Sequence, residues 1–235
     1  MNVVGATHLT SPMWRGSPLM LADPSVTSLE AQAAIPVFGT HPVEMGMADQ
    51  EPEIAKRLGS DRCYRDMFKR AFPEDGGRID FSNVAKAIAS FERTLVSFGS
   101  DFDKGDLPED AGVGQRVFER TCSSCHSGPN FTDLAYHRIG PFEPASTDLG
   151  LGEKTGQAED RGKFRTPSLR NVALSAPYWH DGSVRTLAEA VDRHGLHVAE
   201  AERAPLLAFL DALTDRDFVS RKSLAMPMTA CGKPL

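Results

Sequence analysis

The sequence of 235 residues predicts an all-α fold with long irregular loops. The clearest helical segment is 79–98, in which Val84, Ile88, Phe91 and Leu95 are spaced by four, three and four residues. This spacing is typical of one buried face of a helix. No segment shows the sustained alternation of apolar and polar residues that indicates a half-buried strand. The remaining segments are rich in Gly, Pro and Asp, which favours loops between the helices.

The other elements of the N-terminal half are shorter or less regular. Residues 1–50 contain many Pro, Gly and Met residues and are expected to be irregular, with one short helix around 28–34. Residues 53–72 are expected to form a pair of helices. Ser82 is the expected N-cap of the 79–98 helix, because a serine hydroxyl can accept the first free backbone N–H groups. The charged, glycine-containing stretch 100–112 is expected to link two domains.

The C-terminal half contains three expected helices and one long loop. A helix over 113–121 leads into Cys-Ser-Ser-Cys-His at 122–126, and 127–163 is expected to be a loop. Thr186 and Glu189 have the spacing of a capping box at the start of a second helix. The third helix spans 200–213. Apolar or ring-bearing positions of one face recur in the last two helices: Leu187, Ala190, Val191 and His194, then Leu206, Phe209, Leu210 and Leu213.

Composition limits the possible partners. The formal net charge is −6 and the basic residues are scattered, so nucleic acid is not an expected partner. No run approaches the roughly 18 apolar residues of a membrane span, and the first residues lack the zones of a secretory signal. Cys63 and Cys231 stand alone in the sequence. They are either two unrelated thiols or a disulfide formed in an oxidising compartment, and the sequence leaves both readings open.

Cys122, Cys125 and His126 form a C-x-x-C-H motif, which is the attachment signature of c-type haem. Each thiol can add to one vinyl group of the porphyrin, and the adjacent histidine then faces the iron as an axial ligand. The competing interpretations are a zinc site and a redox dithiol. Structural zinc needs four ligands, usually in two pairs, and the only second pair, His194 and His197, has marginal spacing. The motif therefore favours haem c.

His194 is the best candidate for the second axial ligand. Its helix places it on an apolar face, where an imidazole without a partner would be costly. Alternatives are that His194 is a core histidine bonded to the backbone, or that His197 or a methionine binds the iron instead. Two axial side chains would give a six-coordinate iron, suited to electron transfer and closed to peroxide.

The sequence resembles the bacterial di-haem cytochrome c peroxidase and MauG family, and within it the MbnH-type di-haem enzymes most closely. The resemblance runs through nearly the whole chain. It is carried by four segments: SLEAQAAIPVFGTHPVEMG at 28–46, NVAKAIASFERTL at 83–95, CSSCHSGPNFTD at 122–133 and DRGKFRTPSLRNVALSAPYWHDGSVRTLAEAV at 160–191.

The resemblance implies two cytochrome c-like domains, an N-terminal haem that reacts with peroxide and a C-terminal haem that relays electrons. The motif at 122–126 matches the C-terminal haem. Its distal ligand lies eight residues after the Thr of the T-L-x-E segment, a position that is His194 in this sequence. Ser175 and Pro177 match residues whose carbonyl oxygens bind a calcium ion between the haems, against the alternative of a plain loop. Arg165 and Arg170 resemble partners of the haem propionates, with solvated surface arginines as the alternative.

In the first domain, Gln32, Pro36 and Glu44 match the peroxide pocket, where Glu44 would move a proton between the peroxide oxygens. Without the resemblance, Glu44 would be interpreted as surface charge. The sequence departs from the family because it holds only one C-x-x-C-H, and the family's first motif is expected upstream of residue 1. Relatives often use a tryptophan between their haems. Trp14 is near the expected region, but Leu21 aligns closer to that position, so Trp14 is more simply interpreted as a buried structural residue.

These observations give a specific set of expectations. A partial peroxidatic domain spans 1–99, a C-terminal cytochrome c domain spans 100–218, and the tail 219–235 packs back on the first domain. The implied activity is reduction of hydrogen peroxide, or its use to oxidise a partner protein, in the periplasm. The electron donor would be a small cytochrome c or cupredoxin. The alternatives are a single-haem electron carrier and an inactive, truncated fragment.

Overall fold

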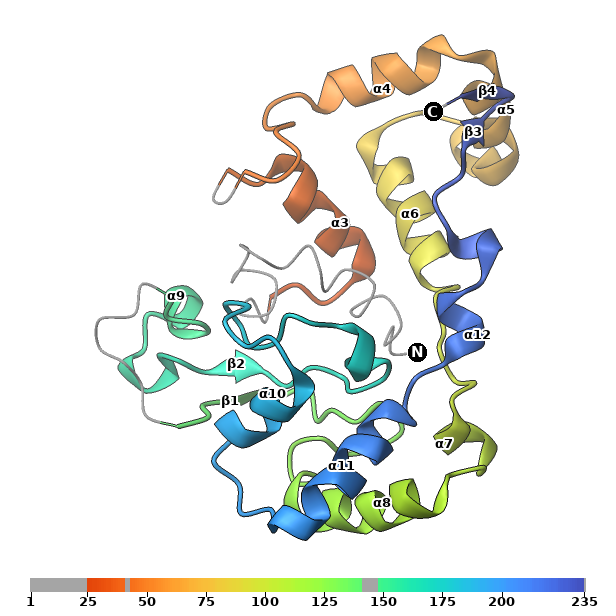
Figure 1. Ribbon diagram of the computed structural model, residues 1–235. Coiled ribbons are helices and arrows are strands. Elements are labelled where there is room, and N and C mark those ends of the chain that lie inside the picture. Colours follow the sequence, from red (N-terminus) through yellow and green to blue (C-terminus); the bar gives the residue numbers. More distant parts are fainter. Residues whose placement is uncertain (1–24, 41–42, 141–147, 235) are drawn as a thin grey trace. The chain divides into compact units, whose positions relative to one another are not determined.

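The computed structural model describes residues 25–40, 43–140 and 148–234, and it is mostly helical, which confirms the expected all-α class (Figure 1). The described chain forms two compact units. The first unit comprises 25–94 together with 221–234, and the second comprises 95–220. Trp14 and Leu21 lie outside the described residues. Within the described part of the chain, no helix is long and apolar enough to cross a membrane.

Two helices form the centre of the first unit. α3 (Leu29–Phe38) begins after Ser28, whose hydroxyl accepts a hydrogen bond from the backbone of Ala31. It packs against α6 (Phe81–Glu92), where the rings of Phe38 and Phe81 meet edge to face with centroids 4.5 Å apart. Two further helices, α4 (Glu51–Ser60) and α5 (Arg62–Ala71), form the expected pair and are followed by the 3-10 turn η2 (Pro73–Asp75).

α6 differs from its prediction at its cap and on its buried face. The N-cap is Asp80, whose carboxylate accepts from Asn83 N at 2.9 Å, so the prediction of Ser82 is wrong. The buried positions are Phe81, Asn83, Ala85 and Ala89. Ile88 and Phe91 are 37% and 49% exposed, so their predicted burial is wrong. Ala85 and Ala89 are buried instead, together with Phe81 and Asn83, whereas Ile88 and Phe91 lie on a more exposed flank.

The C-terminal tail is tied to α5. A short hairpin of β3 (Thr229–Ala230) and β4 (Lys233–Pro234) follows the 3-10 turn η5 (Lys222–Leu224). Cys231 in its turn forms a disulfide with Cys63, 168 residues earlier, and Lys233 pairs with Asp61 at 2.7 Å. Of the two readings of these cysteines, the structure shows the disulfide.

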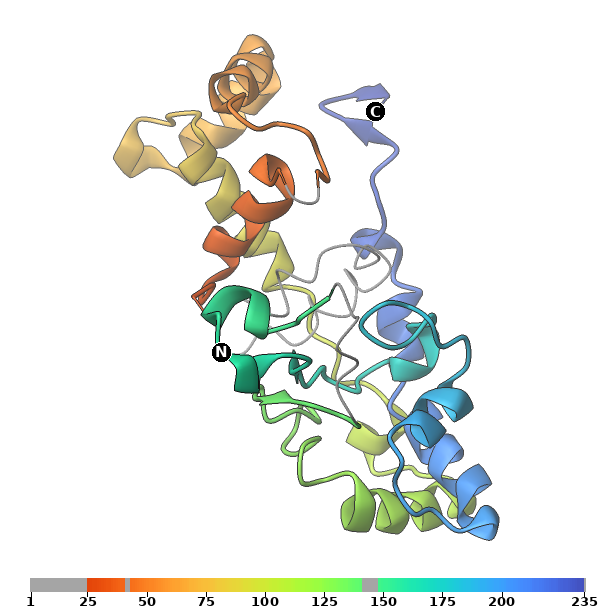
Figure 2. The ribbon, with the colours of Figure 1, turned by 90° about the vertical axis from the view of Figure 1, so that its left-hand side faces the viewer.

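The second unit is built on the packing of α8 (Glu109–Thr121) against α11 (Glu200–Asp211), which lie side by side in both ribbon views (Figures 1 and 2). Gly114 makes this approach possible, because a Cβ there would overlap the carbonyl oxygen of Pro205. The core between and around the helices consists of Val117, Phe118, Phe131, Val172, Leu206, Phe209, Leu210 and Leu213. The four apolar residues predicted on one face of the 200–213 helix are buried: Leu206, Phe209, Leu210 and Leu213.

The rest of the second unit consists of short elements. These are α7 (Asp101–Lys104), β1 (Tyr136–His137), α9 (Gly152–Thr155), η3 (Ala158–Asp160), β2 (Phe164–Arg165), η4 (Val172–Leu174), α10 (Leu187–Arg193) and α12 (Arg216–Val219). The stretch predicted as a linker, 100–112, therefore contains α7 and the first turn of α8. The capping box of Thr186 and Glu189 is present at α10, as predicted.

Candidate functional site

The C-x-x-C-H segment forms one tight turn at the end of α8. Cys122 is the C-cap residue, and its N–H donates to Phe118 O at 2.8 Å. Its carbonyl oxygen then accepts from Cys125 N at 3.3 Å and from His126 N at 3.0 Å. Both thiols are free and partly buried. Burial raises the pKa of the Cys122 thiol, so this group is a thiol and not a thiolate at neutral pH.

His126 is oriented by a backbone carbonyl. Its Nδ1 lies 3.0 Å from the carbonyl oxygen of Phe131, a residue of the apolar core. Burial lowers the pKa of His126, and the backbone contacts with Phe131 and Pro167 oppose that effect only in part. The imidazole is therefore neutral, with its proton on Nδ1 toward Phe131 O and its lone pair on Nε2. This is the form that binds a metal through Nε2.

His194 has a similar backbone contact. It is the C-cap residue of α10, its Nδ1 lies 2.7 Å from Ala190 O, and no hydrogen bond within the described part of the chain reaches its Nε2. The ring centroids of His126 and His194 are 6.5 Å apart, and the ring planes are inclined by 60°. Two bonds of about 2 Å to a shared metal, plus about 1.1 Å from each nitrogen to its ring centre, require about 6.2 Å. The two histidines thus fit a pair of axial haem ligands.

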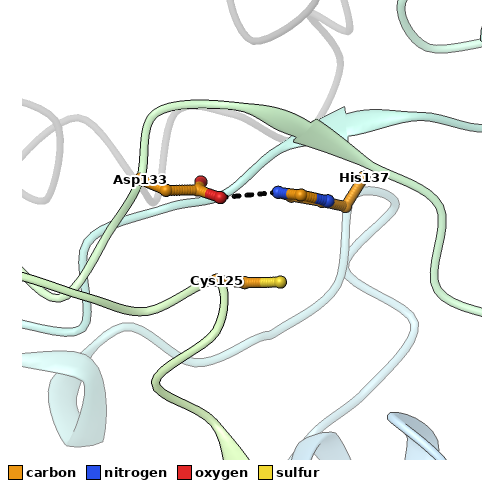
Figure 3. Close-up of side chains that lie close together, drawn as sticks. All are labelled: Cys125, Asp133 and His137. Carbon is orange, nitrogen blue, oxygen red and sulfur yellow. Dashed lines mark hydrogen bonds and ion pairs between the residues drawn. The ribbon is translucent and has the colours of Figure 1, made fainter.

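Cys125 belongs to a second group of potential metal ligands. The Cys125 thiol, the Asp133 carboxylate and the His137 imidazole each place one atom within 4.8 Å of the others (Figure 3). Asp133 and His137 are hydrogen-bonded to each other at 2.7 Å. Burial would raise the pKa of Asp133, but hydrogen bonds from His137 and from the backbone of Ala135 lower it overall. A zinc ion here would use only one of the two motif cysteines and neither His126 nor His194, so the whole motif fits haem better.

The two arginines predicted near the haem have different surroundings. Arg165 lies in β2, which pairs with β1, and its Nε donates to Leu134 O at 3.3 Å. Arg170 is only 2% exposed, so the alternative of a solvated surface arginine is wrong for this residue. All five of its N–H groups have acceptors in the protein: both oxygens of Asp103 and the carbonyl oxygens of Ser97 and Pro129.

Arg170, held by Asp103, therefore fixes the loop that follows the C-x-x-C-H motif. The two N–H groups that reach Pro129 hold this loop two residues before Phe131, whose carbonyl orients His126. Burial would raise the pKa of Asp103, but the hydrogen bonds from Arg170 and Ser100 outweigh it and lower the pKa. Asp103 is thus ionised and forms a bidentate ion pair with the guanidinium of Arg170.

Ser175 and Pro177 lie directly after η4, where the Ser175 hydroxyl donates to Val172 O at 2.8 Å. Among the described residues, no hydrogen bond reaches the backbone carbonyl oxygen of Ser175 or of Pro177. Carbonyl oxygens are suitable ligands for a hard cation such as Ca²⁺.

The residues of the expected peroxide pocket lie in the first unit. Gln32 and Pro36 are four residues apart in α3 and so share one face of it. The chain then turns back, and Met45 N donates to Pro36 O at 3.0 Å. This bond places the backbone of Glu44 beside the end of α3, and the Glu44 side chain is exposed.

Comparison with known proteins identifies the family. A sequence model described as di-haem cytochrome c peroxidase matches residues 3–110. A cytochrome c551 peroxidase of Nitrosomonas europaea is 37% identical over 82% of this chain and 60% of its own length. The MauG protein of Methylophilus methylotrophus is 33% identical over 90% of this chain and 66% of its own. A solved MauG-like protein associated with microbial copper homeostasis has a TM-score of 0.81 and 32% identity, covering 88% of this chain and 74% of that one.

The chain belongs to the di-haem cytochrome c peroxidase and MauG family. This confirms the family predicted from the sequence, and membership implies haem c as the cofactor. The fold agrees with a diheme peroxidase of Burkholderia thailandensis at a TM-score of 0.65 and 22% identity. The chain spans 60% to 66% of the length of the two curated relatives described above.

Proposed function

We propose that the chain carries one haem c attached to Cys122 and Cys125, with His126 and His194 as its axial ligands. The observation that carries the proposal is the pair of neighbouring imidazoles, with ring centroids 6.5 Å apart and Nδ1 of each next to a backbone carbonyl oxygen. When bound, the haem supplies one-electron redox chemistry. Two side-chain ligands leave no coordination position open, which suits a site that relays electrons.

The protein residues would tune this haem in two ways. The carbonyl oxygens of Phe131 and Ala190 hold the imidazole tautomers and so the direction of each Nε2. The aromatic cluster of Phe131, Phe118 and Phe209 keeps water away from the His126 side. Arg165 is the proposed partner of a haem propionate. Arg170 would serve the haem only indirectly, through the loop at Pro129.

We further propose that the parent activity is reduction of hydrogen peroxide, or its use to oxidise a partner protein. Glu44 would take a proton from one peroxide oxygen and return it to the other, and Gln32 would orient the peroxide. The fold-back of the chain onto Pro36, which brings the backbone of Glu44 to the end of α3, supports this assignment. A Ca²⁺ ion on the carbonyl oxygens of Ser175 and Pro177, a small cytochrome c or cupredoxin as donor, and a periplasmic location complete the proposal.

One observation favours a second candidate. The 235 residues contain a single C-x-x-C-H, so the chain supplies covalent attachment for one haem only. A single-haem electron carrier would follow if no second haem joined the first unit.

The two candidates differ in haem stoichiometry and peroxide turnover. The full chain is produced with a c-type maturation system, and its pyridine haemochrome is measured per chain together with peroxide consumption in the presence of a reduced donor. Turnover supports the peroxidase. One haem per chain with a low-spin spectrum and no turnover supports the electron carrier.

A further inference from the structure

Trp179 has a backbone conformation that a bulky residue seldom adopts. Its φ is +75°, in the left-handed region that favours glycine. Its indole meets the His194 imidazole edge to face, with centroids 5.5 Å apart and planes inclined by 85°. Such backbone conformations persist only where the surroundings fix them, and they are concentrated at functional sites.

Hydrogen bonds within the turn around Trp179 fix its backbone conformation. Tyr178 N donates to Val184 O at 2.7 Å, and Val184 N donates back to Tyr178 O at 3.3 Å, which closes the segment 178–184 into a narrow turn. Gly182 N donates to Trp179 O at 3.2 Å inside it. The Tyr178 hydroxyl donates to Val172 O and so anchors the turn to the core. The backbone of Trp179 is therefore held from both ends of the turn.

A cation fixes the indole itself. The guanidinium carbon of Arg193 lies 4.8 Å from the centroid of the Trp179 ring, a cation–π distance. Arg193 also donates to the Ser183 hydroxyl at 2.6 Å, within the same turn. Because Arg193 precedes His194 directly, consecutive residues contact the indole, one through a charge and the other through a ring. The turn and the end of α10 are thus locked together at Trp179.

We propose that Trp179 is a positioning residue that fixes the plane of the His194 imidazole, an inference that rests on the proposed axial pair. The hydrogen bond from Nδ1 to Ala190 O fixes the tautomer, but it lets the ring pivot about the Nδ1···O line. The indole lies against the ring and restricts this pivot. The angle between the planes of His126 and His194 is thereby held at 60°.

The inclination of two axial imidazoles determines how the iron d orbitals split, so the g values of the low-spin ferric haem report it directly. The test uses the full, haem-loaded chain and its EPR spectrum. We expect Trp179→Leu to shift and broaden the largest g value. Trp179→Phe keeps an aromatic edge beside His194 and should stay near the wild type.

A second readout is the binding of cyanide to the ferric haem, which must displace His194. Loss of the aromatic contact should increase the apparent cyanide affinity by about threefold to tenfold in Trp179→Leu, the range that an aromatic pair contributes. Leu196→Ala is the control, because Leu196 is an exposed apolar residue two positions after His194. It should change neither the g values nor cyanide binding.

If Trp179→Leu does not fold, Arg193→Gln is measured in its place. It removes the cation beside the indole and should shift the g values in the same direction by a smaller amount. Wild-type g values and cyanide affinity in Trp179→Leu, or in Arg193→Gln where that variant replaces it, would overturn the inference. A high-spin spectrum of the wild-type protein would instead reject the proposed axial pair.

Discussion

Replacing Arg170 by methionine should destabilise the second unit strongly, because it breaks a buried ion pair. The side chain of Arg170 is 2% exposed and that of Asp103 is 12% exposed. Methionine fills the aliphatic part of the arginine but leaves the Asp103 carboxylate with hydrogen bonds from Ser100 alone. Removing one partner of a buried pair typically costs about 3–5 kcal/mol. The partial exposure of Asp103 favours the lower end, about 3 kcal/mol.

The assay is thermal unfolding followed by circular dichroism at neutral pH. For a unit of this size, about 3 kcal/mol corresponds to a decrease in Tm of roughly 10 °C. Arg120→Met is the matched control, because the Arg120 and Glu202 side chains pair at 2.8 Å but are 54% and 35% exposed. An exposed pair contributes about 1 kcal/mol at most. A loss in Arg170→Met no larger than that of Arg120→Met would refute the role of Arg170 in fixing the loop after the C-x-x-C-H motif.

The same pair predicts a pH dependence. The pKa of Asp103 is lower in the folded protein than in the unfolded chain, so the ionised group adds stability above the usual aspartate pKa of about 3.9. This contribution decreases as the pH falls below that value and the carboxylate takes up a proton. The difference in Tm between the wild type and Arg170→Met should therefore be larger at pH 7 than at pH 3. An equal difference at both values would contradict the assignment.

Three further outcomes are expected. His194→Ala should convert the low-spin ferric spectrum to a high-spin one, and an unchanged spectrum would reject His194 as a ligand. Serine in place of both Cys63 and Cys231 should destabilise the first unit by up to about 5 kcal/mol in denaturant unfolding, since the bridge closes a segment of 168 residues. If Glu44 moves the peroxide proton, Glu44→Gln should lower peroxide turnover by a factor of about 10² or more without changing haem content; turnover within threefold of wild type would remove Glu44 from the mechanism.

Some features set by neighbours in sequence could be predicted, although the N-cap of α6 was placed at Ser82 and not at Asp80; features set by the choice of tertiary partner were harder to predict. The capping box at Thr186 and Glu189 is an interaction within one turn, and it is present as predicted. The face of α6 depends on what packs against it. A spacing of three and four residues fits the row of Ile88 and Phe91, but the row that is buried contains Ala85 and Ala89.

In the candidate site, too, the local motif could be predicted and the tertiary contacts could not. C-x-x-C-H is a local motif and could be found by inspection, and the candidacy of His194 followed from its helix face and from family likeness. Trp179 and the pair of Asp133 and His137 were missed because their loops take their conformation from distant contacts. The four-residue spacing of Asp133 and His137 was the only available sign. Arg170 could not be assigned to Asp103, since 67 residues separate them and no periodicity links them.

The central claim is that Cys122 and Cys125 hold a haem covalently between His126 and His194. Its most direct test is mass spectrometry of the chain matured with a haem-attachment system, after extraction with acid acetone. We predict that the peptide containing 122–126 retains the mass of one haem and that Cys63 and Cys231 carry none. A peptide with two unmodified thiols, and a pigment that passes entirely into the acetone, would contradict the account.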